Sequence, residues 1–219
     1  MSEKKKIKVI FVGSKAVGKT SLISQYVNES FTEIYLLVIG VDKSRKKIKI
    51  GNEEVTLEIF DTAGQEDYRS VNKLFMKNTQ IALIVYDITN EQSFGELNEW
   101  INVVQNSNKN SEIVFGIAAN KSDLFEKRKV SKQEGERFAK ENNSLFFETS
   151  AKDYDSINNV MNKLTEKYLE KQKEKSSKET LDNPPIKEIV PDIKELINSV
   201  DKNESVLPHL KPCFKCSIS

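Results

Sequence analysis

The chain has 219 residues, of which 37% are hydrophobic and 31% charged, a balance typical of one globular domain with a polar appendage. Its formal net charge of +1 provides no general attraction to nucleic acid, so we expect no nucleic-acid partner. The only histidine, His209, argues against histidine general-base catalysis and histidine-rich metal sites. The two cysteines, Cys213 and Cys216, lie near the C-terminus and cannot cross-link a core, which fits a reducing compartment. No stretch approaches the ~20 apolar residues of a membrane span.

Strand-like and helix-like segments alternate along the first 170 residues. Apolar or alternating runs predict strands at 7–12, 43–50, 55–60, 81–86, 113–119 and 145–147. Helical spacing predicts helices at 21–27, 91–105, 132–142 and 157–169. Gly51-Asn52 indicates a hairpin, and Ser131 with Glu134 forms a capping-box pattern. This order predicts an α/β fold with a mostly parallel six-stranded sheet and helices on both faces.

The composition changes near Lys171, so we divide the chain into a domain at 1–170 and a tail at 171–219. Residues 171–185 are rich in Lys, Glu and Ser and predict a flexible tether. Residues 186–200 have some helical spacing but contain Pro191. We interpret them as a weakly ordered linker, with a docking helix as the alternative.

A glycine-bounded loop lies between the first strand and the first helix, in the sequence Gly13-Ser14-Lys15-Ala16-Val17-Gly18-Lys19-Thr20. The pattern G-x-x-x-x-G-K-[ST] in this context predicts a phosphate-binding loop. Backbone N–H groups surround the phosphates, and the dipole of the following helix adds positive potential. Lys19 supplies a full charge, and the hydroxyl of Thr20 is a ligand for Mg²⁺. The predicted nucleotide-binding residues here are Lys15, Ala16, Val17, Gly18, Lys19, Thr20 and Ser21.

Asp61-Thr62-Ala63-Gly64-Gln65-Glu66 follows a predicted strand. Asp61 can hold Mg²⁺ through a water and so complete the shell begun by Thr20. Gly64 can bring a backbone N–H to a terminal phosphate, and Gln65 can orient an attacking water, which makes Gln65 the candidate catalytic residue.

Two further polar motifs follow later strands, Asn120-Lys121-Ser122-Asp123 and Glu148-Thr149-Ser150-Ala151-Lys152. A carboxylate such as Asp123 accepts hydrogen bonds from guanine N1–H and its 2-amino group, a donor pair that adenine lacks. Asn120 can fix the loop, and Lys121 can lie along the base. The second motif can offer backbone N–H groups to guanine O6, so Ser150, Ala151 and Lys152 join the predicted base site.

Over about residues 5–170 the chain resembles the Ras superfamily of small GTPases, and Rab proteins most of all. The Rab-like segments are Ile39-Gly40-Val41-Asp42, Tyr68-Arg69-Ser70-Val71, Ile84-Val85-Tyr86-Asp87-Ile88-Thr89 and Trp100 after Ser93-Phe94. Trp100 alone would be interpreted as a core residue. The resemblance implies GTP/GDP binding with Mg²⁺, slow hydrolysis and loops at about 31–42 and 64–76 that contact exchange factors, activating proteins and effectors. Phe31 matches the aromatic residue that covers guanine in the family.

Two positions depart from the family pattern in the catalytic region. Val38 replaces the family's threonine, which binds Mg²⁺ through its hydroxyl and the γ-phosphate through its backbone. Lys15 stands where glycine or serine is usual, so it can crowd Gln65 and an arginine finger, supply charge in cis, or point to solvent. We therefore hypothesise slow hydrolysis in a membrane-anchored switch for vesicle traffic or signalling, with a non-hydrolysing GTP-bound scaffold as the alternative. A metabolic kinase is disfavoured, because no lid or second-substrate region is visible.

The chain ends in Cys216-Ser217-Ile218-Ser219, which matches the C-a-a-X prenylation motif and predicts farnesylation. One lipid binds membranes only marginally, and residues 173–219 have eight lysines against eight acidic residues, so no polybasic patch adds to it and Cys213 is a candidate second lipid site. Together with the resemblance, these features predict a protein at the cytoplasmic face of membranes with a cytosolic pool.

Overall fold

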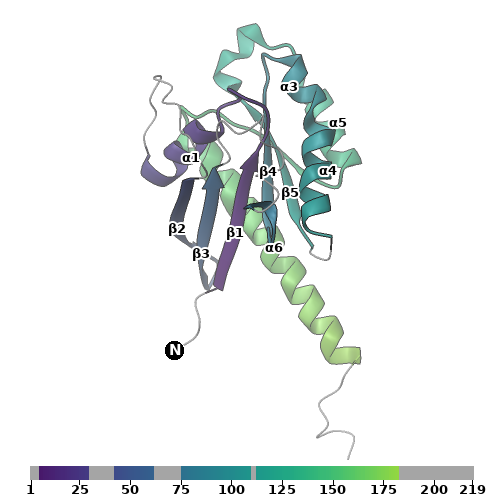
Figure 1. The fold of residues 1–219 in the computed structure, drawn as a ribbon. Coiled ribbons are helices and arrows are strands. Elements are labelled where there is room, and N and C mark those ends of the chain that lie inside the picture. The colour runs from purple at the N-terminus through teal and green to yellow at the C-terminus, as the bar shows by residue number, and fades with distance from the viewer. Residues whose placement is uncertain (1–4, 30–41, 62–74, 110–111, 183–219) are drawn as a thin grey trace, which may run out of the picture. The chain divides into compact units, whose positions relative to one another are not determined.

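The computed structural model describes residues 5–29, 42–61, 75–109 and 112–182. A six-stranded sheet in the order β2-β3-β1-β4-β5-β6 forms its centre (Figure 1). The strands are β1 (Lys5–Val12), β2 (Asp42–Ile50), β3 (Glu53–Asp61), β4 (Ile81–Asp87), β5 (Val114–Asn120) and β6 (Leu145–Glu148). Only the pair β2–β3 is antiparallel. The expected mostly parallel six-stranded α/β sheet is confirmed.

The β2–β3 hairpin turns at Gly51-Asn52, as the sequence predicts. Gly51 has a φ of 57°, a left-handed conformation that glycine adopts without steric cost.

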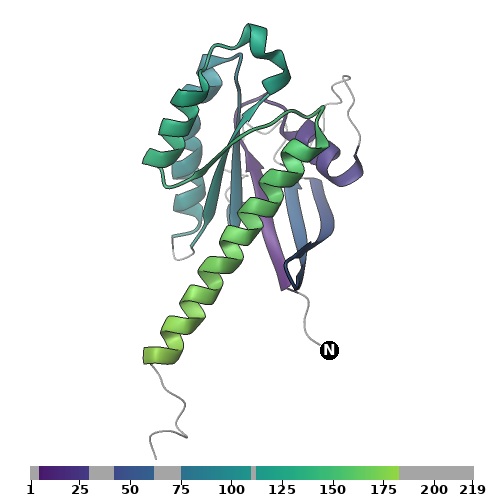
Figure 2. The same cartoon turned by 180° about the vertical axis from the view of Figure 1, so that it is seen from behind.

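Helices cover both faces of the sheet (Figures 1 and 2). They are α1 (Lys19–Asn28), α3 (Glu91–Gly95), α4 (Leu97–Ser107), α5 (Lys132–Glu141) and α6 (Tyr154–Asp182), with a 3₁₀ helix η2 (Ser122–Lys127) that the sequence analysis missed. The predicted capping box is present, because Ser131 accepts from the Glu134 amide and Glu134 accepts from the Ser131 amide.

Each face of the sheet has its own apolar core, because successive side chains of a strand point to opposite faces. On β1, Ile7, Val9 and Phe11 pack with α1 and α6, whereas Ile10 and Val12 pack on the side of α3, α4 and α5. Trp100 of α4 is 7% exposed in the second core, as expected. The two cores hold the sheet between the helices and so fix where the strands end.

The predicted helix at 91–105 is two helices, and this expectation was wrong in that detail. α3 ends at Gly95 and α4 begins at Leu97, with Glu96 between them. Glycine is a poor helix former, which weakens the segment at this point. The Glu96 carboxylate accepts hydrogen bonds from Ser14 Oγ at 2.6 Å and Gln92 Nε2 at 3.1 Å, which hold the junction.

The flexible tether expected from Lys171 was also wrong as far as Asp182, because α6 continues to that residue. Lys, Glu and Gln are good helix formers, so a segment without an apolar face can still extend an existing helix. The pattern of contacts between residues divides the chain into two compact units, Met1–Gln172 and Lys173–Ser219. In the second unit the structure describes only the helical residues as far as Asp182.

Several expectations concern residues outside the described ranges. These are the loops at about 31–42 and 64–76, except for Asp42, Phe75 and Met76, and the linker at 186–200.

Candidate nucleotide-binding site

The predicted site residues follow the carboxyl ends of neighbouring strands. Asp61 ends β3 beside Phe11 of β1, and the loop from Gly13 follows β1. Asp87 ends β4 and pairs with Asn120, the last residue of β5. Glu148 ends β6 directly before the Thr149–Lys152 segment. Because parallel strands end at one edge, segments far apart in sequence meet there.

The loop from Gly13 to Gly18 wraps around the ammonium group of Lys19. Lys19 is 4% exposed, and its Nζ donates to the carbonyl oxygens of Gly13 at 2.7 Å and Ser14 at 2.8 Å. The helix α1 begins at Lys19, so Thr20 and Ser21 lie in its first turn. A cation and a helix N-terminus therefore face the same loop, which suits an anionic ligand.

Close packing leaves no room for a side chain at the two glycines of the loop. Gly13 has a φ of 142°, and a Cβ there would collide with the backbone oxygen of Val85. Gly18 has a φ of 97°, and a Cβ there would collide with the amide of Asn120. Ala16 adopts a φ of 61° without being glycine, which is a strained conformation. The loop is thus held tightly against β4 and β5.

Asn120 links the phosphate loop to the segment Thr149–Lys152 that follows β6. Its side chain is buried, with Nδ2 donating to the Val17 carbonyl at 2.7 Å and Oδ1 accepting from Thr149 Oγ1 at 3.2 Å. The predicted role of Asn120 in fixing a loop matches these bonds. Thr149, which is fully buried, belongs to the predicted motif but was not selected as a site residue, because a threonine beside Ser150 carries no distinct sequence signal.

Asp123 lies between two residues of the 150–152 segment. Its Oδ1 accepts from Ser150 Oγ at 2.7 Å, and its Oδ2 is 3.4 Å from Lys152 Nζ. Burial raises the pKa of Asp123, but hydrogen bonds from Ser150, its own backbone amide and Lys152 outweigh that effect. The pKa therefore lies below its usual value, and the carboxylate is ionised at neutral pH.

Lys121 is held by an acidic residue that the sequence analysis did not select. Its Nζ lies 2.6 Å from Asp87 Oδ2, and Asp87 Oδ1 accepts from both the amide and the hydroxyl of Thr89. Lys121 itself has a left-handed φ of 63°. An acidic residue at the end of a buried strand was the signal that would have identified Asp87.

Lys15 is exposed, while Ser14 beside it bonds Glu96 at the α3–α4 junction. Ala151 is 8% exposed. The predicted residues Lys15, Ala16, Val17, Gly18, Lys19, Thr20, Ser21, Asp61, Asn120, Lys121, Asp123, Ser150, Ala151 and Lys152 all lie at or just beyond the carboxyl ends of the strands. Phe31, Val38, Gly64, Gln65, Cys213 and Cys216 lie outside the described residues.

Thr20 and Asp61 supply the kinds of oxygen that Mg²⁺ prefers, a hydroxyl and a carboxylate. Thr20 is half-buried in the first turn of α1, and Asp61 is 4% exposed at the end of β3. No group of three or more His, Cys, Asp or Glu residues within the described ranges is arranged to hold a metal. The donor set fits Mg²⁺ that shares its shell with phosphate oxygens and waters.

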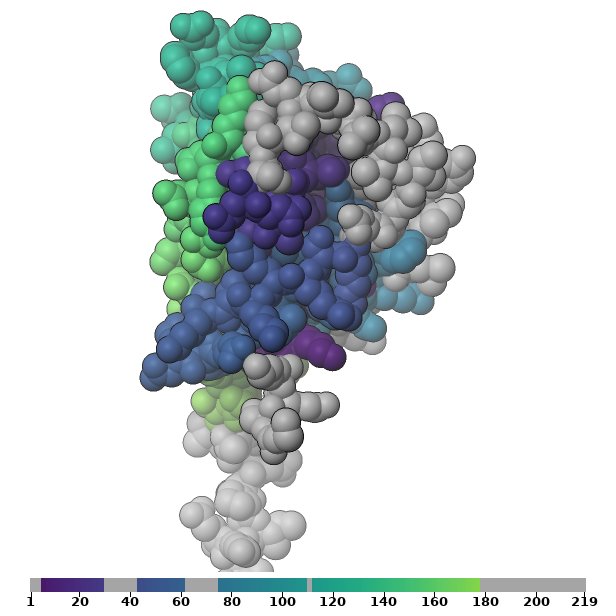
Figure 3. All heavy atoms as spheres, turned by 90° about the vertical axis from the view of Figure 1, so that its left-hand side faces the viewer, coloured from purple at the N-terminus to yellow at the C-terminus, as the bar shows by residue number. Residues whose placement is uncertain are grey.

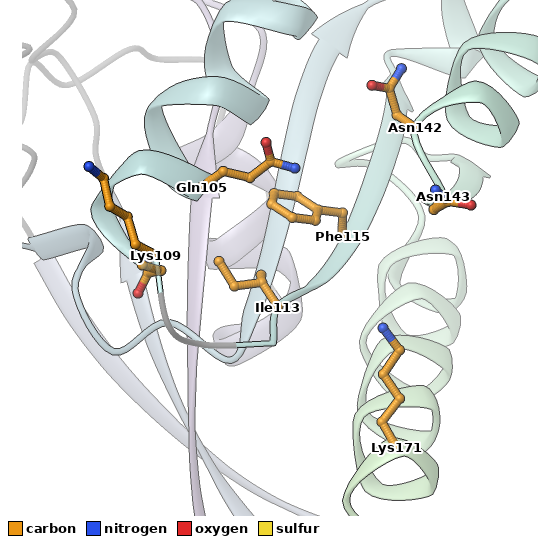
Figure 4. Close-up of a pocket in the computed structure, with 8 residues that line it drawn as sticks. Gln105, Lys109, Ile113, Phe115, Asn142, Asn143 and Lys171 are labelled. Atoms are coloured by element: carbon orange, nitrogen blue, oxygen red, sulfur yellow. The ribbon is translucent and has the colours of Figure 1, made fainter. Parts of the chain in front are cut away.

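A pocket of about 330 Å³ lies elsewhere, near the amino end of β5 (Figure 4). It is lined by Gln105, Asn108, Lys109, Ile113, Phe115, Asn142, Asn143 and Lys171. None of the predicted site residues contributes to it, so this pocket is separate from the candidate nucleotide site.

The fold and the strand-end motifs define a P-loop GTPase domain, and comparison places it in a family. A model of the Ras family matches residues 8–170, and the chain belongs to that family of small GTPases. It is Rab-like: it is 40% identical over 163 residues to the Ras-related protein RabQ of Dictyostelium discoideum, covering 74% of this chain and 79% of the relative.

Among the described residues, no helix is both long and apolar enough to cross a membrane.

Proposed function

We propose that this Rab-like GTPase binds GTP and GDP at the carboxyl edge of its sheet and acts as a nucleotide-dependent switch. The observation that carries the proposal is the bond from Asn120 to the Val17 carbonyl, which joins the phosphate loop to the base motif. A phosphate site and a base site held at a fixed separation suit one nucleotide that spans both.

Guanine recognition in this proposal uses Asp123 and the amide of Ala151. The amides of Ser150 and Lys152 already donate to Ser156 Oγ and Ser150 Oγ, so the Ala151 amide is the one we assign to guanine O6. The two oxygens of Asp123 accept from guanine N1–H and the 2-amino group.

Substitution of the base-recognising carboxylate tests this assignment. Asp123→Asn replaces one acceptor oxygen by an amide N–H donor. This donor would face the 2-amino group of guanine, which also donates, whereas it would complement the 2-oxo group of xanthine, which accepts. We expect GDP affinity to fall by about a hundredfold or more and xanthosine diphosphate affinity to rise. Asp155→Asn, an exposed acid on α6, is the matched control. Unchanged GDP affinity in Asp123→Asn would remove Asp123 from the base site.

Mg²⁺ would be held by Thr20 and, through a water, by Asp61. When bound, it neutralises charge on the outer phosphates. Lys19, fixed at the centre of the loop, adds its charge to the same phosphates, and the amides of the loop orient them. Gln65 is proposed to orient the attacking water.

Slow hydrolysis is part of the proposal and rests on Lys15 and Val38. The side chain of Lys15 is exposed, which fits the alternative in which it points to solvent. Val38 has no hydroxyl to offer to the metal. Restoring both residues to the family pattern, Lys15→Gly with Val38→Thr, should raise the single-turnover hydrolysis rate severalfold. The two single variants assign the gain to one position or the other. An unchanged rate in the double variant would contradict slow hydrolysis caused by these residues.

A GTP-bound scaffold that does not hydrolyse is the second candidate, because the same two substitutions favour it. The nucleotide released by denaturing the freshly purified protein separates the two. Mostly GDP supports a working switch, whereas mostly GTP supports the scaffold.

Membrane anchoring and protein partners complete the proposal. Prenylation at Cys216, with Cys213 as a second lipid site, would anchor the protein at the cytoplasmic face of a membrane, in vesicle traffic or signalling. Exchange factors, activating proteins and effectors would bind through residues 31–42 and 64–76. Cys216→Ser should release the protein to the cytosol, and a variant that stayed on membranes would contradict this assignment.

A further inference from the structure

One face of the sheet, on the strands β1, β3 and β2, carries cations in register. Thr56 of β3 pairs with Lys6 of β1 and Lys47 of β2, and Glu58 pairs with Lys8 and Arg45. The same face continues with Lys43 opposite Phe60 and Lys49 opposite Glu54. We name this surface the basic sheet face, with the members Lys6, Lys8, Lys43, Arg45, Lys47 and Lys49.

The charge of this face is not a consequence of the charge of the chain. It has six basic residues against two acidic ones, Glu54 and Glu58, whereas the whole chain has 34 basic and 33 acidic residues. All six basic residues except Lys8 are exposed. Figure 3 views the molecule from the side of β2, where the strand's atoms lie at the surface.

The two ends of the basic sheet face differ in how the cations are balanced. At the carboxyl end of β3, Glu58 pairs with Lys43 at 2.9 Å and Arg45 at 3.1 Å. Lys8 and Lys43 also lie over the ring of Phe60, at 4.7 and 5.2 Å from its centroid. At the amino end of β1, no ion pair between described residues engages Lys6, Lys47 or Lys49. The positive charges of these three exposed lysines are therefore not balanced by ion pairs with other described residues.

Like charges are crowded around Lys8, the half-buried member of this face. Burial lowers the pKa of Lys8, and repulsion from Lys43 lowers it further, against the opposing effect of Glu58. A counter-charge from outside the domain would relieve this repulsion.

Protection of a sheet edge accounts for only part of the pattern. Lysines on an edge strand discourage pairing with other chains, and β2 is an edge strand. β1, however, is an interior strand that pairs with β3 from Lys5 and with β4 from Val9 onward, and it carries Lys6 and Lys8 on the same face. Gln80 bonds both the amide and the carbonyl of Lys8, so edge protection does not explain a cation at that position. The excess of cations on one face indicates a surface that meets an anionic partner.

The last turns of α6 within the first unit lie at the same end of the sheet. Lys5 Nζ sits 5.8 Å from the centroid of the Tyr168 ring, and Lys5 precedes Lys6 at the amino end of β1. Because side chains alternate along β1, Lys5 lies on the face that α6 covers, and Lys6 lies on the opposite face.

We propose that the basic sheet face binds an anionic membrane surface, with Lys6, Lys47 and Lys49 as its principal contacts. Neighbouring strands are about 4.8 Å apart and alternate residues about 7 Å apart, so the cations form a flat grid that suits a layer of lipid headgroups. Each lysine close to an anionic leaflet strengthens partition by about fivefold. The proposal is independent of nucleotide binding and of lipid attachment.

The test uses the full-length chain without attached lipid, with vesicles of phosphatidylcholine alone or mixed with phosphatidylserine. Flotation should recover the protein with the mixed vesicles only. Raising the salt from about 0.1 M to about 1 M, which shortens the Debye length from about 10 Å to about 3 Å, should abolish recovery.

A triple variant assigns the binding to this face. Lys6→Gln, Lys47→Gln and Lys49→Gln together should weaken partition by about a hundredfold. The matched control changes three exposed lysines on other surfaces, Lys127, Lys129 and Lys140, to Gln, and should change partition by less than about fivefold, the effect of one lysine near the leaflet. Equal losses in the two variants would overturn the proposal, because general charge would then explain the binding. Absence of wild-type binding to the mixed vesicles would also overturn it and leave an acidic protein as the alternative partner.

Discussion

The carboxyl edge of the sheet and the β2–β3 hairpin are stabilised in different ways. At the carboxyl edge, buried side chains connect segments far apart in sequence, as when Asn120 bonds Val17 and Ser150 bonds Asp123. In the hairpin, nine residues of each strand pair in regular register around Gly51-Asn52, and the pairing between the two strands is local in sequence. A substitution at the carboxyl edge therefore disturbs several segments, whereas one at the hairpin turn meets no other segment.

The backbone shows the same contrast. Gly13, Ala16, Gly18 and Lys121 all have positive φ near the candidate site. In the hairpin only Gly51 does, at the turn itself. The strained positions near the site persist because surrounding contacts hold them, which is a common feature of ligand-binding loops.

The largest expected effect is a difference in stability between alanine variants of two glycines with positive φ. Gly13→Ala would place a Cβ against the Val85 carbonyl, so we expect unfolding free energy to fall by about 3 kcal/mol or more and nucleotide binding to be lost. Gly51→Ala meets no atom within 4 Å and should cost only the conformational strain, about 1 kcal/mol. Urea unfolding and titration with a fluorescent GDP analogue measure both. Similar losses in the two variants would contradict the packing explanation.

A second comparison uses two asparagines. Asn120→Ala leaves the Val17 carbonyl and the Thr149 hydroxyl without their buried partner, so it should cost about 2–3 kcal/mol of stability and weaken GDP binding strongly. Asn142→Ala removes a partly buried bond to the Phe138 carbonyl at the end of α5 and should cost about 1 kcal/mol. GDP affinity should be unchanged in the Asn142 variant. A loss of affinity in both would mean that general stability, rather than the loop connection, controls binding.

A smaller effect is expected at the strained alanine. Ala16→Gly removes the penalty of a φ of 61° but adds chain entropy to the unfolded state, so we expect a net stabilisation of about 0.5 kcal/mol. Ala139→Gly in the buried face of α5 should instead destabilise by about 1 kcal/mol. Thermal unfolding of both variants checks the opposite signs.

The smallest effect concerns pH. The pKa of Asp123 is lowered from 3.8, so the carboxyl is ionised above that value. The stability and the guanine binding that depend on the ionised form are then at their maximum. Both are lost only as pH falls through the lowered pKa. GDP affinity should therefore stay flat between about pH 8 and about pH 5, well above the usual aspartate range. A decline in wild-type affinity within this range that is absent in Asp123→Asn would show that the pKa is raised instead.

Motif spacing predicted most of the described site, because each motif begins where a buried strand ends. Lys19, Asn120 and Asp123 needed no structure to be selected. Asp87 and Glu96 were missed, since their partners Lys121 and Ser14 are far away in the sequence. The continuation of α6 was missed because composition alone does not distinguish a charged tether from a charged helix that extends a packed one.

The sequence by itself determined the α/β class, the mostly parallel six-stranded sheet and the chemistry of the loops. It did so because periodicity and glycine placement are local properties of the chain. Only the tertiary structure decided that Asn120 joins the phosphate loop to the base segment, and that lysines from β1 and β2 share one face. Both depend on the register between strands, and that register is set by the packing of two cores rather than by any single segment.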